Sequence, residues 1–131
     1  MNNTNIDFKL NYSFDQRLIE SKRIKQLYPD KIPVICERSL YAGNDCPSIK
    51  KRKYLVSKDV TIAHLIFILR KGLNIDSTKG LFLFIDGNVL SCSYTIESIY
   101  NIYKDDDEFL YITYIFENTF GWDTIGWDTI G

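Results

Sequence analysis

The most apolar part of the chain is residues 109–116, which read Phe-Leu-Tyr-Ile-Thr-Tyr-Ile-Phe. This run is rich in β-forming residues and contains neither glycine nor proline, so it predicts a strand that is buried on both faces and lies at the centre of its sheet. The residues upstream then have to cover that strand. Downstream the chain becomes polar and glycine-punctuated, which predicts that it leaves the core and presents a glycine-bearing tail to solvent.

The first thirty residues have a pattern typical of helices. Residues 1–12 are rich in asparagine, and the apolar side chains at positions 6, 8, 10 and 12 fit either a short helical turn or an extended arm. From Ser13 the pattern is clearer, because Gln16 follows three residues later, as in a capping box, and apolar residues then recur at helical spacing. We expect this amphipathic helix to end at Pro29.

Two short strands are predicted next. Residues 32–38 form the first, with Pro33 near its start, where a missing hydrogen-bond donor is tolerated. After a loop at about 39–48, the basic residues 50–53 lead into the β-forming residues 54–56. A hairpin between these neighbours is the natural pairing.

The second half of the chain alternates helices and strands again. Asp59 and Thr61 offer caps for a helix over residues 62–69, which Gly72 is expected to stop. Residues 81–85 predict a third strand, followed by a tight turn at Asp86-Gly87 or Gly87-Asn88, a returning strand at 89–90 and a short helix at 95–103. This order predicts an α+β roll, in which one long helix crosses a mixed sheet and the first and last strands pair in parallel at its centre.

Composition narrows the class of protein. The chain has 131 residues, 45% of them hydrophobic and 15% aromatic, which is typical of one folded domain. A formal net charge of −1 gives no overall attraction to nucleic acid, and we expect no nucleic-acid partner. Cys36, Cys46 and Cys92 form no CxxC pair, and we find neither a signal peptide nor a long apolar run, so we expect a soluble cytosolic protein with free thiols.

Catalysis is a weak hypothesis for this sequence. A cysteine enzyme would need Cys36 or Cys92 near His64, the only histidine, but Cys36 stands inside an apolar strand, where a thiol usually acts as a small hydrophobe. No metal-ligand spacing or phosphate-binding glycine loop is present, and we expect no metal or cofactor. The acidic run 105–108 lacks the spaced ligands of a calcium loop, so we expect it to be a solvated turn.

The basic cluster at residues 50–53 leaves two interpretations open, a phosphate-binding patch or a solvated edge. The short strand after it is the more informative feature. Because it is flanked by lysines and follows a long loop, it is a candidate edge strand, and such an edge can accept an added strand from a partner peptide. Neighbouring lysines would favour acidic peptides.

Three separated segments carry a family resemblance. Residues 25–35, residues 51–56, and residues 109–114 with the Phe120-Gly121 ending resemble the autophagy ubiquitin-like modifiers, the family of GABARAP, microtubule-associated-protein light chain three and yeast autophagy-related protein eight. The resemblance covers residues 8–121. It implies a ubiquitin-like β-grasp roll with two extra N-terminal helices, a modifier domain at 1–121 and an exposed tail at 122–131.

The resemblance also implies a function. The family is conjugated through a C-terminal glycine, here Gly121 after Phe120, to phosphatidylethanolamine by activating and conjugating enzymes, after processing by a cysteine protease. It then acts on the autophagosome membrane as an adaptor for cargo receptors and autophagy machinery. The alternatives are a modifier conjugated to protein, an unconjugated peptide-binding module, or a Gly121 that is only a flexible joint.

Two pockets for an aromatic-x-x-aliphatic peptide are implied by the same resemblance. The residues expected to line the aromatic pocket are Glu20, Ile24, Pro33, Lys53, Leu55 and Phe109. Those expected to line the aliphatic pocket are Tyr54, Val56, Val60, Leu65 and Ile68. Lys31 and Lys51 match basic positions that contact or gate the peptide. Ser57 and Leu65 depart from the usual proline and aromatic residue, so the second pocket is expected to be wider; the alternative is that these side chains are only core.

The tail repeats one pentapeptide, Trp-Asp-Thr-Ile-Gly, at 122–126 and 127–131. Trp122 with Ile125, and Trp127 with Ile130, each have the aromatic-x-x-aliphatic form that the family's pockets accept, so the tail is a candidate self-ligand. It would dock on another molecule or fold back on its own domain. The alternatives are a propeptide removed after Gly121, or an engineered extension or genetic slip.

Overall fold

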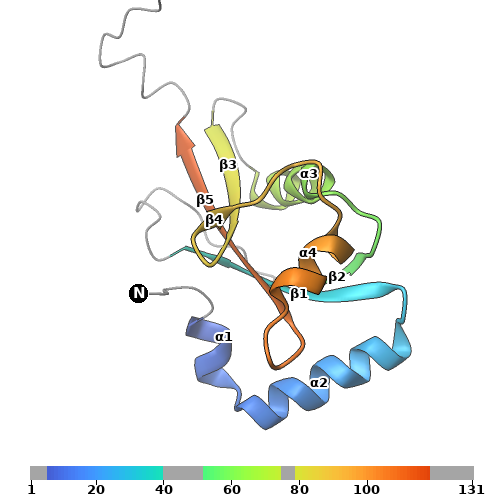
Figure 1. The fold of residues 1–131 in the computed structure, drawn as a ribbon. Coiled ribbons are helices and arrows are strands. Elements are labelled where there is room, and N and C mark those ends of the chain that lie inside the picture. Colours follow the sequence, from blue (N-terminus) through green and yellow to red (C-terminus); the bar gives the residue numbers. More distant parts are fainter. Residues whose placement is uncertain (1–5, 40–51, 75–78, 119–131) are drawn as a thin grey trace, which may run out of the picture.

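The computed structural model describes residues 6–39, 52–74 and 79–118. Its elements in chain order are α1 (Ile6–Asn11), α2 (Phe14–Leu27), β1 (Lys31–Arg38), β2 (Lys53–Ser57), α3 (Ile62–Leu73), β3 (Lys79–Ile85), β4 (Asn88–Val89), α4 (Ile96–Tyr103) and β5 (Leu110–Asn118). Five strands form one sheet in the order β2-β1-β5-β3-β4 (Figure 1). The predicted α+β roll with two N-terminal helices is confirmed.

Strand β5 is the centre of this sheet. It pairs in parallel with β1, from Val34 opposite Leu110 to Arg38 opposite Tyr114, and antiparallel with β3 on its other side. Leu110, Ile112 and Tyr114 are 0% exposed. Both the central position and the parallel pairing with the first strand therefore agree with the sequence prediction.

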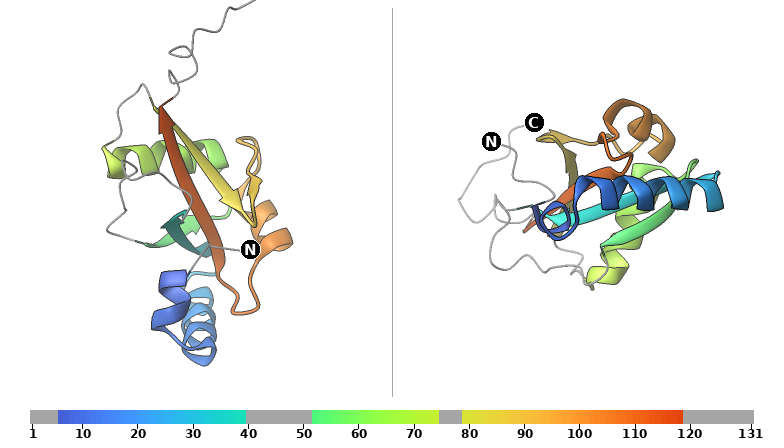
Figure 2. Two further views of the ribbon diagram at one scale, coloured as in Figure 1. Left: turned by 90° about the vertical axis from the view of Figure 1, so that its left-hand side faces the viewer. Right: turned by 90° about the horizontal axis from the view of Figure 1, so that it is seen from below.

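The two faces of the sheet are covered differently. Alternate residues of β5, including Ile112, join the main core with Leu65 and Leu69 of α3 and Ile99 of α4. On the other face Phe109 and Tyr111 form a smaller cluster with Ile35 and with Phe8 of α1. Figure 1 draws α1 and α2 together at the end of the molecule away from α3, and Figure 2 shows α2 running alongside β1, on which it packs.

Local signals set most of the helix starts. The predicted capping box is present, with the Ser13 side chain accepting from the Gln16 amide and the Gln16 side chain accepting from the Ser13 amide. Thr61, and not Asp59, caps α3, and Thr95 caps α4. Residues 6–11 take the helical alternative, in which Phe8 is 6% exposed and packs its ring against Phe109.

Two boundaries correct the sequence prediction. Gly72 does not stop α3, which continues to Leu73; the left-handed residue that ends it is Asn74, with φ 53°. The strand after the β3 turn is Asn88–Val89, one residue earlier than expected. Because Ile85 pairs with Asn88, the turn residues are Asp86 and Gly87, with φ of 50° and 80°, as a two-residue hairpin turn requires.

No helix in the described ranges is both long enough and apolar enough to span a bilayer.

Replacing Ile112 by alanine should test the central position of β5. Ile112 is 0% exposed, so Ile112→Ala is expected to lower the free energy of unfolding by about 2–5 kcal/mol through lost burial and a residual cavity. The matched control is Ile102→Ala on α4, where the side chain is 69% exposed and the change should stay within about 0.5 kcal/mol. Urea unfolding measures both, and equal effects would contradict the assignment.

Candidate functional site

Strand β2 lies at the edge of the sheet, as the sequence predicted. Two hydrogen bonds fix which of its backbone groups are used, from the Cys36 amide to the Arg52 carbonyl at 2.9 Å and from the Lys58 amide to the Asp30 carbonyl at 3.2 Å. Since pairing alternates in an antiparallel ladder, residues 54 and 56 direct their N–H and C=O groups toward β1. The corresponding groups of Lys53 and Leu55 point away from β1, and no described strand pairs with them.

The residues expected to line the aromatic pocket come from three strands and a helix. Leu55 is opposite Pro33, and Pro33 precedes the Val34–Leu110 pair, so Leu55, Pro33 and Phe109 form a row across β2, β1 and the start of β5. Leu55 is 41% exposed, whereas Phe109 is 3% exposed and belongs to the buried cluster with Phe8 and Tyr111. Glu20 and Ile24 are half-buried on α2, the helix that packs on β1.

The aliphatic set lies on the opposite face of the same edge. Tyr54 and Val56 project from β2 toward α3, on the face opposite to that of Leu55. Val56 and Leu65 are buried in the main core, so for these two the core interpretation holds. Tyr54 and Val60 are half-buried, and Ile68 is 43% exposed. The solvent-accessible part of the aliphatic set is therefore formed by Tyr54, Val60 and Ile68.

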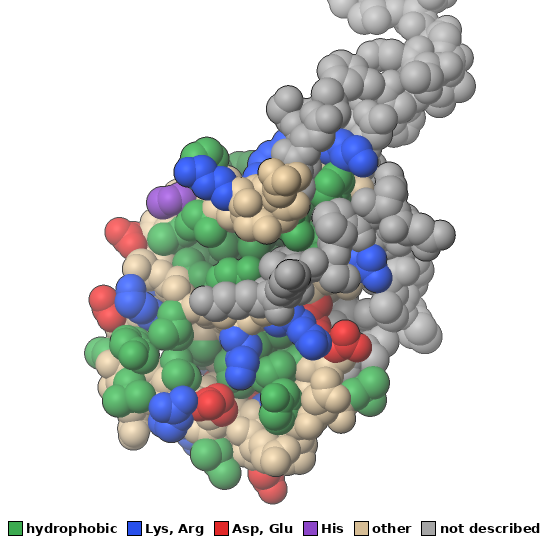
Figure 3. Space-filling view, turned by 180° about the vertical axis from the view of Figure 1, so that it is seen from behind, with side chains coloured by type: hydrophobic (Ala, Val, Ile, Leu, Met, Phe, Trp, Pro, Cys, Tyr) green, Lys and Arg blue, Asp and Glu red, His purple; other side chains and the backbone are tan. Residues whose placement is uncertain are grey.

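Basic side chains accompany the edge. Lys53 is exposed, and the half-buried Lys31 donates from Nζ to the Ser57 hydroxyl at 3.0 Å. Seen from behind, the described surface has hydrophobic side chains gathered on one face with lysine and arginine side chains among them (Figure 3). The predicted positions Lys51, Phe120, Gly121, Trp122, Ile125, Trp127 and Ile130 lie outside the described residues.

An ion pair that the sequence reasoning missed holds α2 beside this region. Asp107 is 0% exposed, and its Oδ2 accepts from Arg17 Nη1 at 2.8 Å and from the Tyr111 hydroxyl at 2.5 Å. Its Oδ1 accepts from the Phe109 amide at 2.9 Å, and its carbonyl accepts from the Ser21 hydroxyl at 2.5 Å. The expectation that residues 105–108 form a solvated turn is therefore wrong for Asp107.

Burial decides the protonation chemistry of this cluster. It raises the pKa of the Tyr111 hydroxyl well above its ordinary value, and the hydrogen bond to Asp107 raises it further, so Tyr111 stays protonated and donates. Burial also raises the pKa of Asp107, against the hydrogen bonds from Tyr111 and Phe109, which lower it. Because every partner of the carboxylate is a donor, the ionised form of Asp107 satisfies the site.

Two other acids of the loop, Asp105 and Glu108, bind helices α1 and α2. Asp105 accepts from Lys9 of α1 at 2.7 Å, and Glu108 accepts from Lys25 of α2 at 2.8 Å. The hydrogen bond from Lys25 lowers the pKa of Glu108. Glu108 has φ 68°, a left-handed conformation that is uncommon outside glycine, and its carbonyl accepts from the Tyr100 hydroxyl at 2.8 Å. The loop thus connects α1, α2 and α4.

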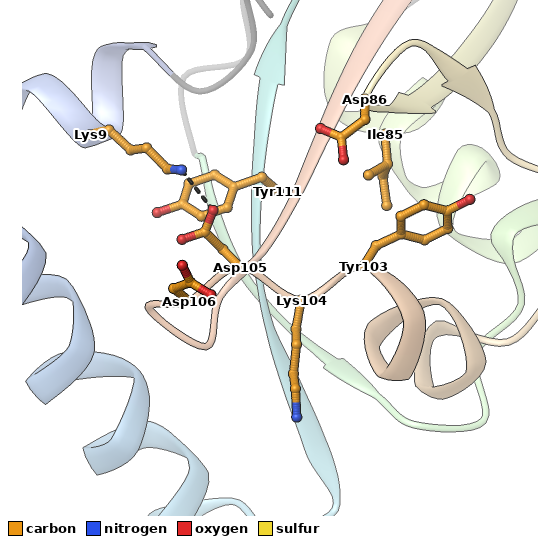
Figure 4. A pocket seen from close by; sticks show the side chains of 8 residues that line it. All are labelled: Lys9, Ile85, Asp86, Tyr103, Lys104, Asp105, Asp106 and Tyr111. Carbon is orange, nitrogen blue, oxygen red and sulfur yellow. Dashed lines mark hydrogen bonds and ion pairs between the residues drawn. The ribbon is translucent and has the colours of Figure 1, made fainter.

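A separate hollow of about 220 Å³ lies on the other side of this loop (Figure 4). Its lining residues are Lys9, Ile85, Asp86, Tyr103, Lys104, Asp105, Asp106 and Tyr111. Lys9 Nζ lies 4.7 Å from the centre of the Tyr111 ring while it pairs with Asp105. The hollow is polar and shares no residue with the two sets at β2.

Comparison with known proteins decides the family. A family model described as autophagy protein Atg8, ubiquitin like, matches residues 16–121. The chain belongs to the Atg8 family of ubiquitin-like autophagy proteins.

Relatives of this Atg8-family chain span nearly its whole length. Autophagy-related protein 8 of Mycosarcoma maydis is 42% identical over 114 residues, which are 87% of this chain and 95% of that protein. The protein of the same name from Schizosaccharomyces pombe is 43% identical over 114 residues, covering 87% and 93%. The crystal structure of Trypanosoma brucei ATG8 superimposes with a TM-score of 0.80 at 32% identity, over 87% of this chain and 97% of that one.

The two thiols in the described ranges differ in exposure. Cys36 is 1% exposed, and burial raises the pKa of its thiol to about 12, so the thiol stays protonated and inert at neutral pH. Cys92 and His64 are both exposed, and Cys46 lies outside the described residues. Among the residues that the structure describes, no group of three or more histidine, cysteine or acidic side chains could hold a metal ion. Proteins of this family are in general modifiers and adaptors.

Replacing Asp107 by asparagine should show how much the ion pair stabilises. Asp107→Asn leaves the Arg17 guanidinium, whose side chain is 10% exposed, without its anionic partner, so the free energy of unfolding should fall by about 3–5 kcal/mol. Asp106→Asn, on an exposed neighbour in the same loop, should change it by less than about 0.5 kcal/mol.

A double variant separates the ion pair from general damage to the loop. Arg17→Met with Asp107→Leu removes both charges, and should recover part of the stability lost in Asp107→Asn. Urea unfolding at pH 7 measures all three variants. A double variant no more stable than Asp107→Asn would contradict a coupled pair.

Proposed function

We propose that this chain is a ubiquitin-like autophagy modifier that is conjugated through Gly121 to phosphatidylethanolamine. On the autophagosome membrane it acts as an adaptor that binds extended peptides at the edge of β2. The observation that carries the second half of this proposal is the outward direction of the Lys53 and Leu55 backbone groups, with apolar side chains on both faces beside them. Family membership supports the first half.

The alternation of side chains along a strand explains the spacing of the peptide motif. In an extended peptide the first and fourth side chains are an odd number of residues apart, so they point to opposite faces and are separated by about 10 Å. The aromatic set beside Leu55 and the aliphatic set beside Tyr54 also lie on opposite faces of β2. A peptide strand added at this edge would therefore direct its aromatic residue toward α2 and its aliphatic residue toward α3.

Backbone and charge add to this recognition. The amides and carbonyls of Lys53 and Leu55 offer hydrogen bonds worth about 0.5–1.5 kcal/mol each. Exposed Lys53 and half-buried Lys31 favour acidic residues near the motif, mainly by increasing the association rate. Cargo receptors and autophagy machinery that carry such motifs are the proposed partners.

Peptide spacing tests this mode of binding. Moving the aliphatic residue from the fourth position to the third places it on the same face as the aromatic residue, so it loses a contact worth about 1.5–3 kcal/mol and the Kd should rise about 10- to 150-fold. Fluorescence anisotropy with labelled twelve-residue peptides measures this. Equal affinities for the two spacings would exclude strand addition across two pockets.

A variant of the edge provides the matching protein control. Leu55→Asp should weaken the fourth-position peptide at least tenfold while leaving the unfolding transition in place, because Leu55 is 41% exposed. Ile102→Ala, on an exposed residue of α4, should bind the peptide as the wild type does.

Conjugation uses the end of β5. The described part of the strand ends at Asn118, three residues before Gly121. Glycine has no Cβ, so its backbone can enter a narrow enzyme channel and its carboxyl group can be approached closely during activation and transfer. In the proposed order, a cysteine protease removes residues 122–131, the Gly121 carboxyl is activated by adenylation and passed as a thioester, and the amine of the lipid then displaces the thiol.

Reconstitution tests the conjugation. The lipid-conjugating enzymes of the pathway, with phosphatidylethanolamine vesicles, should convert a chain ending at Gly121 into a detergent-partitioning product, whereas the unprocessed 131-residue chain should remain unconjugated until the protease is added. Gly121→Ala should strongly reduce the product, because the added methyl crowds the reacting carbonyl. Mass spectrometry identifies the adduct: a protein adduct would point to a protein-conjugated modifier, and function that survives Gly121→Ala would point to an unconjugated peptide-binding module.

A further inference from the structure

We propose that the repeated tail of one molecule docks on the β2 edge of a second copy of this chain. The inference rests on the peptide site proposed above and identifies a ligand for it. In each repeat the tryptophan would be directed toward the α2 side of the edge, and the isoleucine three residues later toward the α3 side. Each copy then carries one acceptor strand and one donor tail.

The tail has the composition that this edge accepts. Trp122 and Ile125, and likewise Trp127 and Ile130, are three residues apart, so in an extended chain they point to opposite faces. An aspartate follows each tryptophan, and residues 119–131 contain no basic residue. The β2 edge offers exposed Lys53 and half-buried Lys31, so the two surfaces are complementary in charge as well as in spacing.

The strand register argues against docking on the same molecule. Leu55 is level with Pro33, which is level with Phe109, and Phe109 lies nine residues before Asn118. Measured along β5, the aromatic side of the edge therefore lies about 30 Å before Asn118, the last described residue. Measured across the sheet, a strand added beyond β2 lies three strand spacings, or about 14 Å, from β5. The straight-line separation is about 33 Å.

The tail is too short to cover this separation comfortably. Trp122 is four residues beyond Asn118 and reaches about 14 Å at most, so the first repeat cannot meet its own edge. Trp127 is nine residues beyond Asn118 and reaches about 32 Å at full extension, with no allowance for passing around the sheet. A second copy imposes no such limit, and this selects the intermolecular contact.

The duplicated pentapeptide gives each tail two alternative segments that can dock, but room for only one partner molecule at a time. Five extended residues separate the two tryptophans by about 17 Å, whereas a domain of about 100 residues has a radius of gyration near 13 Å and is about twice as wide as that separation. One tail therefore holds one partner at a time, with an approximately twofold statistical gain from the second repeat. Because donor and acceptor differ, the contact can propagate into open chains.

This contact would also make the peptide site depend on processing. Cleavage after Gly121, the step proposed above, removes both tryptophans and so leaves an empty β2 edge. The unprocessed chain is expected to be self-associated, with its edge occupied, and the processed chain monomeric, with its edge available to other peptides.

A pair of complementary full-length variants tests the contact. Leu55→Asp disables the acceptor and retains the tail, whereas the double variant Trp122→Ala/Trp127→Ala disables the tail and retains the acceptor. In sedimentation velocity over a concentration range of about two decades that brackets a Kd on the order of tens of micromolar, the wild type should form concentration-dependent oligomers and each variant alone should stay monomeric. A mixture of the two variants should form a 1:1 dimer and nothing larger.

Three other outcomes overturn the inference, and they are distinguishable from failure of the peptide site. The independent probe is an acidic twelve-residue peptide with a Phe-Glu-Glu-Leu core, titrated into the double tryptophan variant. If that probe binds while the wild type stays monomeric at every concentration, the tail contact is wrong and the peptide site stands. If the wild type is monomeric and binds the probe more weakly than the variant does, the tail docks on its own domain. If the probe does not bind and no dimer forms, the proposed peptide site itself fails.

Discussion

The arrangement of the N-terminal helices depends on the hydrogen bonds and the ion pair made by the buried carboxylate of Asp107. Helix α2 buries only Ser21 fully, while Phe14, Ile19 and Leu27 are 44%, 69% and 58% exposed, so polar contacts make up much of its attachment to the sheet. Arg17 donates to the Asp107 carboxylate, and Ser21, one turn later on the helix, donates to the backbone carbonyl of Asp107. The same carboxylate binds the Phe109 amide and the Tyr111 hydroxyl, which lie at the start of the central strand. The charged group that binds α2 therefore also binds the start of the central strand, beside the aromatic side of the candidate site.

The edge position of β2 gives the second constraint. A single strand with alternating side chains separates two apolar regions by the sheet itself, one beneath α2 and one beside α3. A ligand that pairs with this edge must follow the same alternation, so an odd spacing between its two anchors is required and an even spacing is excluded. The motif preference proposed for the site thus follows from the pleat and from the strand order, and the identity of the lining residues only adjusts the size of each pocket.

Signals that are local in the sequence were sufficient to predict most of the fold. The capping residues Ser13 and Thr61, the apolar run of β5 and the turn at Gly87 each act within a few residues, and the parallel pairing of β1 with β5 and the edge position of β2 agree with the prediction. The failures have distant causes. Asp107 is buried because Arg17 and Ser21, 90 and 86 residues earlier, meet it, and nothing in a run of four acids marks which one turns inward. Similarly, α1 becomes helical where Phe8 packs on Phe109, and Leu65 fills the core while Ile68 of the same helix stays 43% exposed.

Strand β5 also sets the distance between the two proposed activities. Phe109, at the proposed peptide site, directly precedes the strand, and Asn118, the last described residue, lies three residues before Gly121. Nine residues of extended chain separate the two ends by about 30 Å. A molecule anchored to a bilayer through Gly121 would therefore hold its docking edge about the width of a small domain away from the attachment point. That separation leaves room for a receptor peptide to pair with β2 while the modifier is on the membrane, and it is the same separation that puts the edge beyond comfortable reach of the molecule's own tail. In the proposed function the central strand would therefore act as a spacer, because its length would keep conjugation and peptide recognition from competing for one surface.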